Sequence, residues 1–134
     1  MEVYLGASFR VEVAGVGKAT FRGCRGLGAT VEVVQVVEGG STVPRILPGD
    51  VQWEPLVLER GWVQDRQLWD WFQSRDARFG SITLLDREGG TAGRWSFERG
   101  WPSRWMGPSF DADREEIALE CLEIVHEGLT WEVP

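Results

Sequence analysis

Residues 116–126 read EIALECLEIVH, and the structure of this stretch decides the fold class of the chain. As a helix, it would begin at a capping box in residues 113–116, and its apolar residues would recur at helical spacing. As a strand, its apolar face would change between Cys121 and Leu122, as in a strand that is bulged or covered on both sides. The residue pattern alone favours the helix slightly and leaves both structures open.

The remainder of the chain is rich in strand patterns. Alternation predicts a strand at Phe9–Val13, followed by a turn and a hairpin partner at Lys18–Cys24. Further strands are predicted at Ala29–Glu38, Val51–Glu59, Ser81–Leu85 and Gly93–Phe97, the last two being joined by a glycine-rich turn. One helix is predicted at about residues 65–75, where Asp65 is a suitable cap and apolar residues share one face.

The segment 39–49 has an unusual composition for a loop. It holds two adjacent glycines, and its prolines make it unsuited to an inner strand. Its apolar centre, Ile46 and Leu47, would normally be covered, and the chain is small. We expect this segment to be an arm that contacts a neighbouring subunit; the alternative is a loop folded back on its own core.

Length and composition exclude several classes of protein. A chain of 134 residues has the length of a single domain, residues 1–134, and no apolar run is long enough to cross a membrane. The first ten residues lack the pattern of a secretory signal, so we expect assembly in the cytoplasm. Cys24 and Cys121 lie in apolar, strand-like segments, which favours free thiols over a disulfide.

The net charge of −7 is concentrated at one end of the chain. Residues 111–134 hold eight of the 21 acids and a single base, Arg114, so the preceding residues carry 13 acids and 13 bases. A protein that binds nucleic acid directly shows the opposite bias. The charge distribution therefore argues against direct binding of nucleic acid.

No catalytic or metal-binding motif is present in the sequence. His126 is the only histidine, and a hydrogen-bonded structural role is the better interpretation of it than a Ser-His-Asp arrangement. The glycines of residues 23–28 are in the wrong order for a dinucleotide-binding loop and predict a turn. Two cysteines and one histidine without close spacing make no metal site. We therefore predict no enzyme, no cofactor and no metal.

Tryptophan is in excess, with eight residues in a small chain. One small core cannot easily bury eight indoles, so some are expected at a partner surface. Trp71 and Trp95 lie on periodic elements and are predicted core residues. Trp62, Trp105 and Trp131 are the candidates for a subunit interface.

Several ordered motifs resemble the phage tail tube family, which includes the tubes of contractile phages and of extracellular contractile injection systems. They cover about three quarters of the chain, and the most specific are WSF at 95–97, GWP at 100–102, WMGP at 105–108 and LEIVHEGL at 122–129. Arg99 and Gly100 depart from the pattern, because an Asn-Ala pair is usual before Trp-Pro.

This resemblance implies the fold and the role. It implies a mainly β, two-sheet sandwich or barrel-like domain with one flanking helix, and it assigns residues 116–126 to a strand. It also implies a homohexameric ring, similar to the ring protein of type VI secretion, whose joined sheets line a channel. In such a ring, we expect the acids of the last segment, Glu116, Glu120 and Glu123 in particular, to line the channel or the ring face. Plain solubility, or pairing with arginines of a neighbour, is the competing explanation. Rings would stack as the inner tube of a contractile tail and meet sheath, spike or baseplate, and terminator proteins. DNA or effectors would pass without specific binding, and no membrane partner is implied.

Three alternatives remain open at this point. A tube-initiator or terminator paralogue would share these motifs but form one ring instead of a stack. A monomeric β-sandwich binding module would present its tryptophans to a sugar or a peptide. An enzyme is the least favoured, because the sequence offers a lone histidine and no metal-binding spacing.

Overall fold

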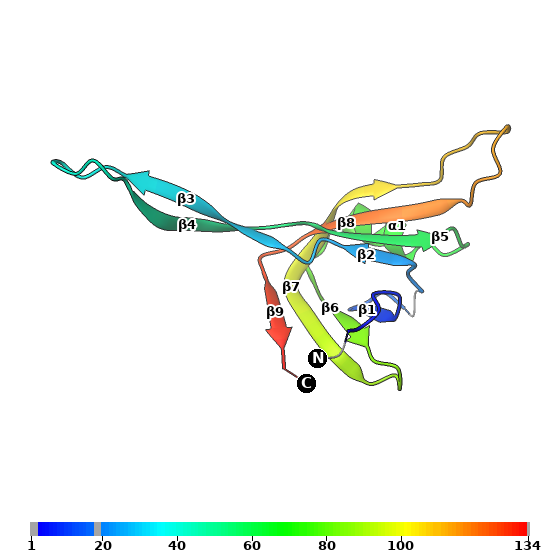
Figure 1. Ribbon diagram of the computed structural model, residues 1–134. Coiled ribbons are helices and arrows are strands. Elements are labelled where there is room, and N and C mark those ends of the chain that lie inside the picture. The colour runs from blue at the N-terminus through cyan, green and yellow to red at the C-terminus, as the bar shows by residue number, and fades with distance from the viewer. Residues whose placement is uncertain (1–2, 18–19, 134) are drawn as a thin grey trace.

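The computed structural model describes residues 3–17 and 20–133 and is built mostly of strands (Figure 1). The strands are β1 (Phe9–Val13), β2 (Gly23–Arg25), β3 (Ala29–Val36), β4 (Arg45–Trp53), β5 (Leu56–Gly61), β6 (Arg78–Leu85), β7 (Thr91–Met106), β8 (Leu119–Val125) and β9 (Leu129–Glu132). The single helix of the described residues, α1, spans Gln67–Ser74. The predicted mainly β fold with one flanking helix is confirmed.

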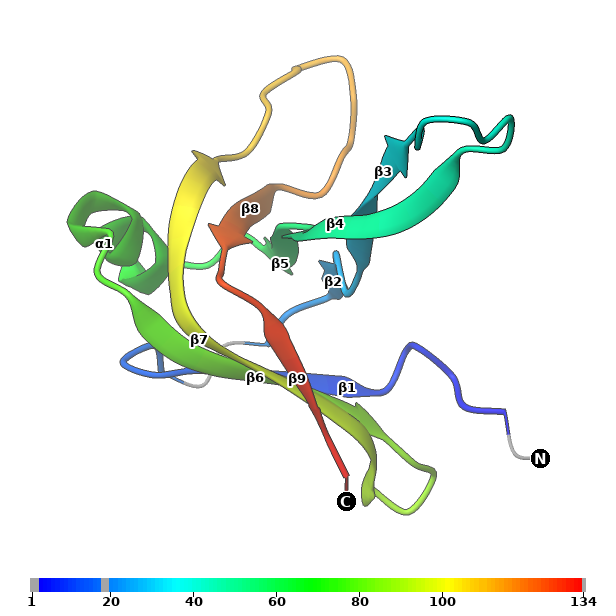
Figure 2. The ribbon, with the colours of Figure 1, turned by 90° about the vertical axis from the view of Figure 1, so that its left-hand side faces the viewer.

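The long strand β7 connects two layers of sheet (Figure 2). Its first half pairs with β6 and β9, and β6 pairs in turn with β1; these strands are called layer A. Its second half, Trp101–Met106, pairs with β8, and β8 is followed by β5 and β2; these strands are called layer B. The path from β1 to β2 has two different ends, so the described strands form no closed barrel.

The core lies between the two layers and is closed by α1. Strands β5 and β8 alternate strictly between buried and half-buried residues, as expected for a sheet with one face against a core. The helix contributes Leu68 and Trp71, both with no exposed surface, to the same cluster as Phe97. The helix therefore lies on the core side of layer B, and the opposite face of layer B is left uncovered.

The helix is close to its predicted position. It spans Gln67–Ser74 within the predicted range 65–75, and Oδ1 of Asp65 accepts a hydrogen bond from the backbone N of Gln67 at 2.9 Å. The helix ends at Arg75, whose φ of 53° is left-handed. No helix among the described residues is long and apolar enough to span a membrane.

The bend of β7 between the two layers depends on two glycines that surround Phe97. A Cβ at Gly80 or Gly100 would lie 2.4 Å from the Phe97 ring, so both positions must lack a side chain for the ring to be buried. Arg99, which directly precedes Gly100, has a φ of 58°, a left-handed conformation that is uncommon for arginine. Asparagine tolerates this conformation better than arginine does.

Two sequence predictions need correction. Strand β1 pairs with β6, and β2 pairs with β5, so the predicted hairpin of Phe9–Val13 with Lys18–Cys24 is wrong; residues 18 and 19 lie outside the described residues. The predicted strand Val51–Glu59 is interrupted at Glu54 and Pro55, where β4 ends and β5 begins. The strand assignment for the C-terminal stretch is confirmed, with β8 at Leu119–Val125.

Candidate assembly surfaces

The most prominent feature is a two-stranded arm, formed by β3 and β4, that projects from the body (Figure 1). Every residue from Ala29 to Trp53 except Gly49 is exposed. The arm is longer than the predicted segment 39–49, because the strands on both sides of that segment belong to it.

Both faces of the arm are apolar. Val33 is 64% exposed and Val34, which points to the opposite face, is 36% exposed. The predicted interface residues Ile46 and Leu47 lie on β4 and are 67% and 40% exposed. An isolated two-stranded hairpin is only marginally stable in water, and an apolar one invites pairing with another chain. The arm therefore has the properties of a segment that another surface covers.

The arm prolongs layer B rather than layer A. Strand β3 follows β2 and β4 precedes β5, so the paired strands of the arm are continuous in sequence with the β2–β5 pair. Between the two ladders, the backbone N of Glu54 donates to the carbonyl oxygen of Gly28 at 3.0 Å. An additional strand paired with the arm would thus extend layer B.

The three predicted interface tryptophans lie on two separate surfaces. Trp131, on β9, is 72% exposed and stacks on Trp95, with 6.0 Å between ring centroids. Trp62 and Trp105 line one mainly apolar groove of about 550 Å³ next to the start of α1, and Trp69 lines it as well. Trp69 and Trp105 meet edge to face at 4.7 Å, so the helix face that carries Trp69 packs against β7.

Glu120 does not face a channel or the face of a ring, and this prediction is wrong. Its side chain is 1% exposed, and its carboxylate accepts hydrogen bonds from Arg60 Nε at 2.7 Å and from Trp105 Nε1 at 2.8 Å. Arg60 is equally buried and also donates to the carbonyl oxygen of Asp65 at 3.1 Å. The pair joins β5, β8, β7 and the segment before α1, so Glu120 holds the fold together.

The two other predicted acids are accessible but lie apart. Glu116 is in the segment before β8 and forms an ion pair with Arg114 at 3.5 Å, with more than half of its side chain exposed. Glu123 lies on the uncovered face of layer B, where its register partners are Val57 on β5 and Arg104 on β7. Register partners in antiparallel strands share a face, so Arg104 lies beside Glu123.

The two cysteines lie on opposite faces of layer B. Cys24 is in register with Leu58 and faces the core, whereas Cys121 is in register with Glu59 on the uncovered face. Burial raises the pKa of the Cys24 thiol to about 11. Burial also raises the pKa of Cys121, and the nearby Glu59 carboxylate adds to this effect. Both thiols are free, and their positions exclude a disulfide between them.

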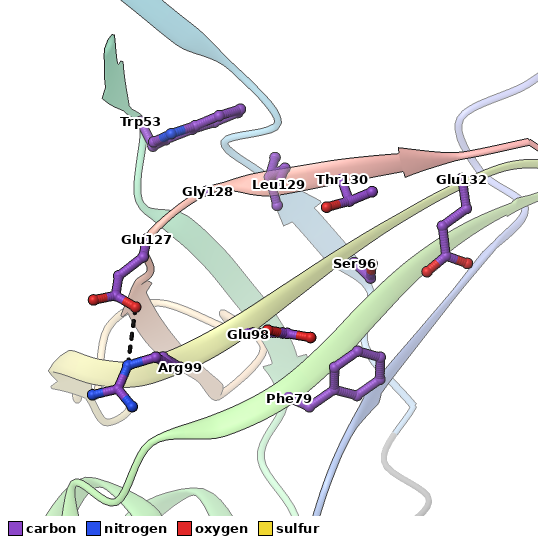
Figure 3. A pocket seen from close by; sticks show the side chains of 10 residues that line it. All are labelled: Trp53, Phe79, Ser96, Glu98, Arg99, Glu127, Gly128, Leu129, Thr130 and Glu132. Carbon is purple, nitrogen blue, oxygen red and sulfur yellow. Dashed lines mark ion pairs between the residues drawn. The ribbon is translucent and has the colours of Figure 1, made fainter. Parts of the chain in front are cut away.

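An open hollow of about 570 Å³ lies at the root of the arm (Figure 3). Figure 3 shows Trp53 and Phe79 on opposite sides of it and the Arg99–Glu127 ion pair, 3.0 Å long, at its margin. Its lining contains no nucleophile paired with a base, and the described residues contain no cluster of histidine, cysteine and acidic residues that could hold a metal ion. Its apolar side chains and charges suit contact with another protein surface better than chemistry.

Two parts of these surfaces are not evident from the sequence. The valine run predicts the strand β3 but not its full exposure, although its apolar residues occupy both faces, a pattern that fits a strand without its own core. The contact of His126 with the root of the arm was also missed, because it joins residues that are 72 positions apart.

An exposed apolar arm and open strand edges define a β protein of the class that assembles with other subunits. The model of the family described as T4-like virus tail tube protein gp19 matches residues 6–130. The chain belongs to this tail tube family, whose members are structural tube proteins rather than enzymes.

The fold is that of solved tube proteins. A chain of the sheath/tube terminator of PVC, an extracellular contractile injection system, has a TM-score of 0.90 at 21% identity, with 99% of each chain covered. A chain of the PVC sheath–tube complex in the extended state has a TM-score of 0.88 at 21% identity, with 98% of this chain and 93% of that chain covered. Hcp1 from Flavobacterium johnsoniae has a TM-score of 0.60 at 15% identity, with 92% and 94% covered. None of the curated protein sequences matches significantly.

Proposed function

We propose that this chain forms homohexameric rings that stack as the inner tube of a contractile tail or injection particle, around a channel for DNA or effectors. The observation that carries the proposal is the arm, whose two apolar faces are left uncovered by its own body. Family membership supports the tube role, and chains of similar fold come from a sheath–tube complex, a baseplate and a sheath/tube terminator.

In this proposal, the ring closes by pairing between strand edges. Layer B has two free edges, β2 on one side and the second half of β7 on the other. Strand β2 has only three residues, but the arm lengthens this side with the eight residues of β3. The edge at Trp101–Met106 of a second copy has a suitable length to pair with the arm. Such pairing joins successive copies of layer B and removes both exposed edges.

The uncovered face of layer B then becomes the channel wall, because α1 and layer A lie on its other side. This face carries Glu123 and Glu59, and also Arg25 and Arg104. The wall has charges of both signs, with Glu123 as its contribution from the predicted acids. A hydrated wall of mixed charge lets DNA or a folded effector pass without being held.

The test replaces Ile46 and Leu47 together with serine. Both side chains are exposed in the single chain, so the free energy of unfolding should change by less than about 1 kcal/mol. If the side chains are buried on assembly, each contributes about 1.5–3 kcal/mol, and the affinity between subunits should fall at least a hundredfold. Sedimentation and negative-stain microscopy of the purified protein report on rings and tubes.

The matched control is Gln35→Ser, because Gln35 is in register with Ile46 on the same hairpin but has no large apolar side chain. This variant should assemble like the parent protein. Unlimited stacking of rings supports the tube role, whereas single rings that do not stack indicate an initiator or terminator. A protein that stays monomeric at all concentrations contradicts the proposal.

A further inference from the structure

The arm meets the body at a closely packed junction, called here the arm joint, which consists of Gly26, Trp53, Pro55, His126 and Gly128. Gly26 has a φ of +105°, and a Cβ there would lie 2.0 Å from the carbonyl oxygen of Pro55. Gly128 has a φ of +142°, and a Cβ there would lie 3.2 Å from Nε1 of Trp53. Two glycines are therefore required for the arm root to approach the body this closely.

His126 occupies the centre of the arm joint. Its ring lies 6.0 Å from the Trp53 ring on the arm and 6.0 Å from the Phe97 ring in the core, measured between centroids. Its Nε2 lies 3.2 Å from the carbonyl oxygen of Glu54, at the end of the arm. Its Nδ1 accepts a hydrogen bond from the backbone N of Gly128 at 3.0 Å. One imidazole thus connects the arm root to the turn between β8 and β9.

These contacts require one particular form of the ring. A nitrogen that accepts a hydrogen bond must have a free lone pair, so Nδ1 carries no proton. The ring proton is then on Nε2, where it is donated to the Glu54 carbonyl oxygen. A protonated imidazolium has two donors and would place an N–H against the N–H of Gly128. The joint therefore fits only neutral His126.

We propose that His126 is the positioning residue of the arm: in its neutral form it fixes the direction in which the arm leaves the body, and its protonation releases the arm root. The inference rests on the proposed role of the arm in assembly. It makes assembly of the tube sensitive to mildly acidic pH.

The pH window follows from the environment of the ring. Burial lowers the pKa of His126 below the ordinary value of 6.5, and the contact with the Glu54 carbonyl acts in the opposite direction. Since the pKa is lower in the folded state, the stabilisation is complete above 6.5 and is lost as the pH falls through the folded pKa. The charged residues on the surrounding elements are Glu54, Glu127, Glu98 and Arg99, and Glu127 is already paired with Arg99.

Nuclear magnetic resonance of the imidazole nitrogens of His126 in the unassembled protein tests the arm joint directly. We expect the Nε2–H tautomer at pH 7 and a titration midpoint below 6.5. The protection factor of the Gly128 amide against hydrogen exchange should be about fivefold lower at pH 5 than at pH 7, a ratio that corresponds to loss of one ordinary hydrogen bond. A midpoint at or above 6.5, or an Nδ1–H tautomer, overturns the inference.

Measuring the extent of assembly between pH 5 and pH 7 tests whether protonation of His126 weakens assembly. The parent protein should assemble less readily as the pH falls, whereas His126→Phe should have a flat profile because its ring packs but does not titrate. His126→Gln serves the same purpose if the phenylalanine variant does not fold. Glu127→Gln is the matched control and should keep the parent profile. A parent-like pH profile in both His126 variants overturns the inference.

The two proposals can fail separately. If the His126 imidazole titrates as expected but the double variant Ile46→Ser with Leu47→Ser assembles like the parent protein, the arm joint stands and the proposed role of the arm is wrong. If those arm variants fail to assemble but the assembly of the parent protein is independent of pH, the role of the arm stands and the positioning role of His126 is overturned.

Discussion

Glu120→Gln should destabilise the folded chain substantially although it removes only a charge. The carboxylate has two oxygens, one bonded to Arg60 Nε at 2.7 Å and the other to Trp105 Nε1 at 2.8 Å. Glutamine has one acceptor oxygen, so its NH2 group would face one of these two donors. Arg60 would at the same time lose its closest anion while its side chain remains 3% exposed.

The decrease in the free energy of unfolding caused by Glu120→Gln can be estimated. Removing one member of a buried ion pair costs about 3–5 kcal/mol. Arg60 retains the Asp65 carbonyl at 3.1 Å and the Asp65 carboxylate at 3.5 Å, so we expect the lower end, about 3 kcal/mol. For a chain of this length that corresponds to a fall in melting temperature of roughly 10 °C.

Urea unfolding of the unassembled protein measures this free energy. Glu123→Gln is the control on the same strand, and because Glu123 lies on the uncovered face it should change stability by less than about 0.5 kcal/mol. The double variant Arg60→Met with Glu120→Leu should be more stable than Glu120→Gln, because no charge is left buried, although the Trp105 indole then loses its acceptor. A loss below about 1 kcal/mol for Glu120→Gln would refute the role of the pair.

Three further predictions follow from the structure. Gly80→Ala should cost about 2 kcal/mol or more in urea unfolding, because its Cβ would lie 2.4 Å from Phe97, whereas Gly61→Ala, with no atom within 4 Å of its Cβ, should be nearly neutral. Arg99→Asn should stabilise the chain by about 0.5–1 kcal/mol in the same assay, because asparagine tolerates a φ of 58° better and the Glu127 pair that it removes is exposed. A maleimide at pH 8 should modify Cys121 well before Cys24, whose pKa is about 11; raising the pH toward 11 should narrow the difference, and preferential labelling of Cys24 would contradict the assignment of faces.

The body of the fold was largely accessible from the sequence because its elements carry local signals. The Ser81–Leu85 and Gly93–Phe97 strands alternate and are joined by glycines, and the helix has a polar residue before its first turn. The C-terminal strand β8 was not accessible in this way. Its apolar residues favour a helix slightly, because Leu119 and Cys121 face away from the core that buries Leu122, and only the resemblance to the tail tube family indicated the strand.

Strand partners were predicted less well than strands. Strands that are neighbours in sequence are expected to pair as a hairpin. This expectation is wrong for β1, which pairs with β6 across more than sixty residues. The exposed hairpin extends beyond the predicted segment 39–49, because composition marks that segment and not the whole of the two strands. Glu120 was misplaced because an acid in a sequence without a nearby base reads as a surface charge, and its partner Arg60 lies sixty residues earlier.

The acidic surplus of the last segment illustrates why charge along a sequence differs from charge in space. Three arginines from upstream strands each pair with one of its acids: Arg60 with Glu120, Arg94 with Glu132 and Arg99 with Glu127. Arg114 contacts two more, Asp111 and Glu116. Within residues 3–17 and 20–133, the acids of this segment without an ion-pair partner are Asp113, Glu115 and Glu123, and of these Glu123 alone lies on a strand. In the proposed ring, layer B would carry one unpaired acid per subunit from this segment, with Arg104 in register beside it. The proposed channel wall would then be close to neutral, which suits a conduit for cargo of either charge better than a uniformly acidic wall.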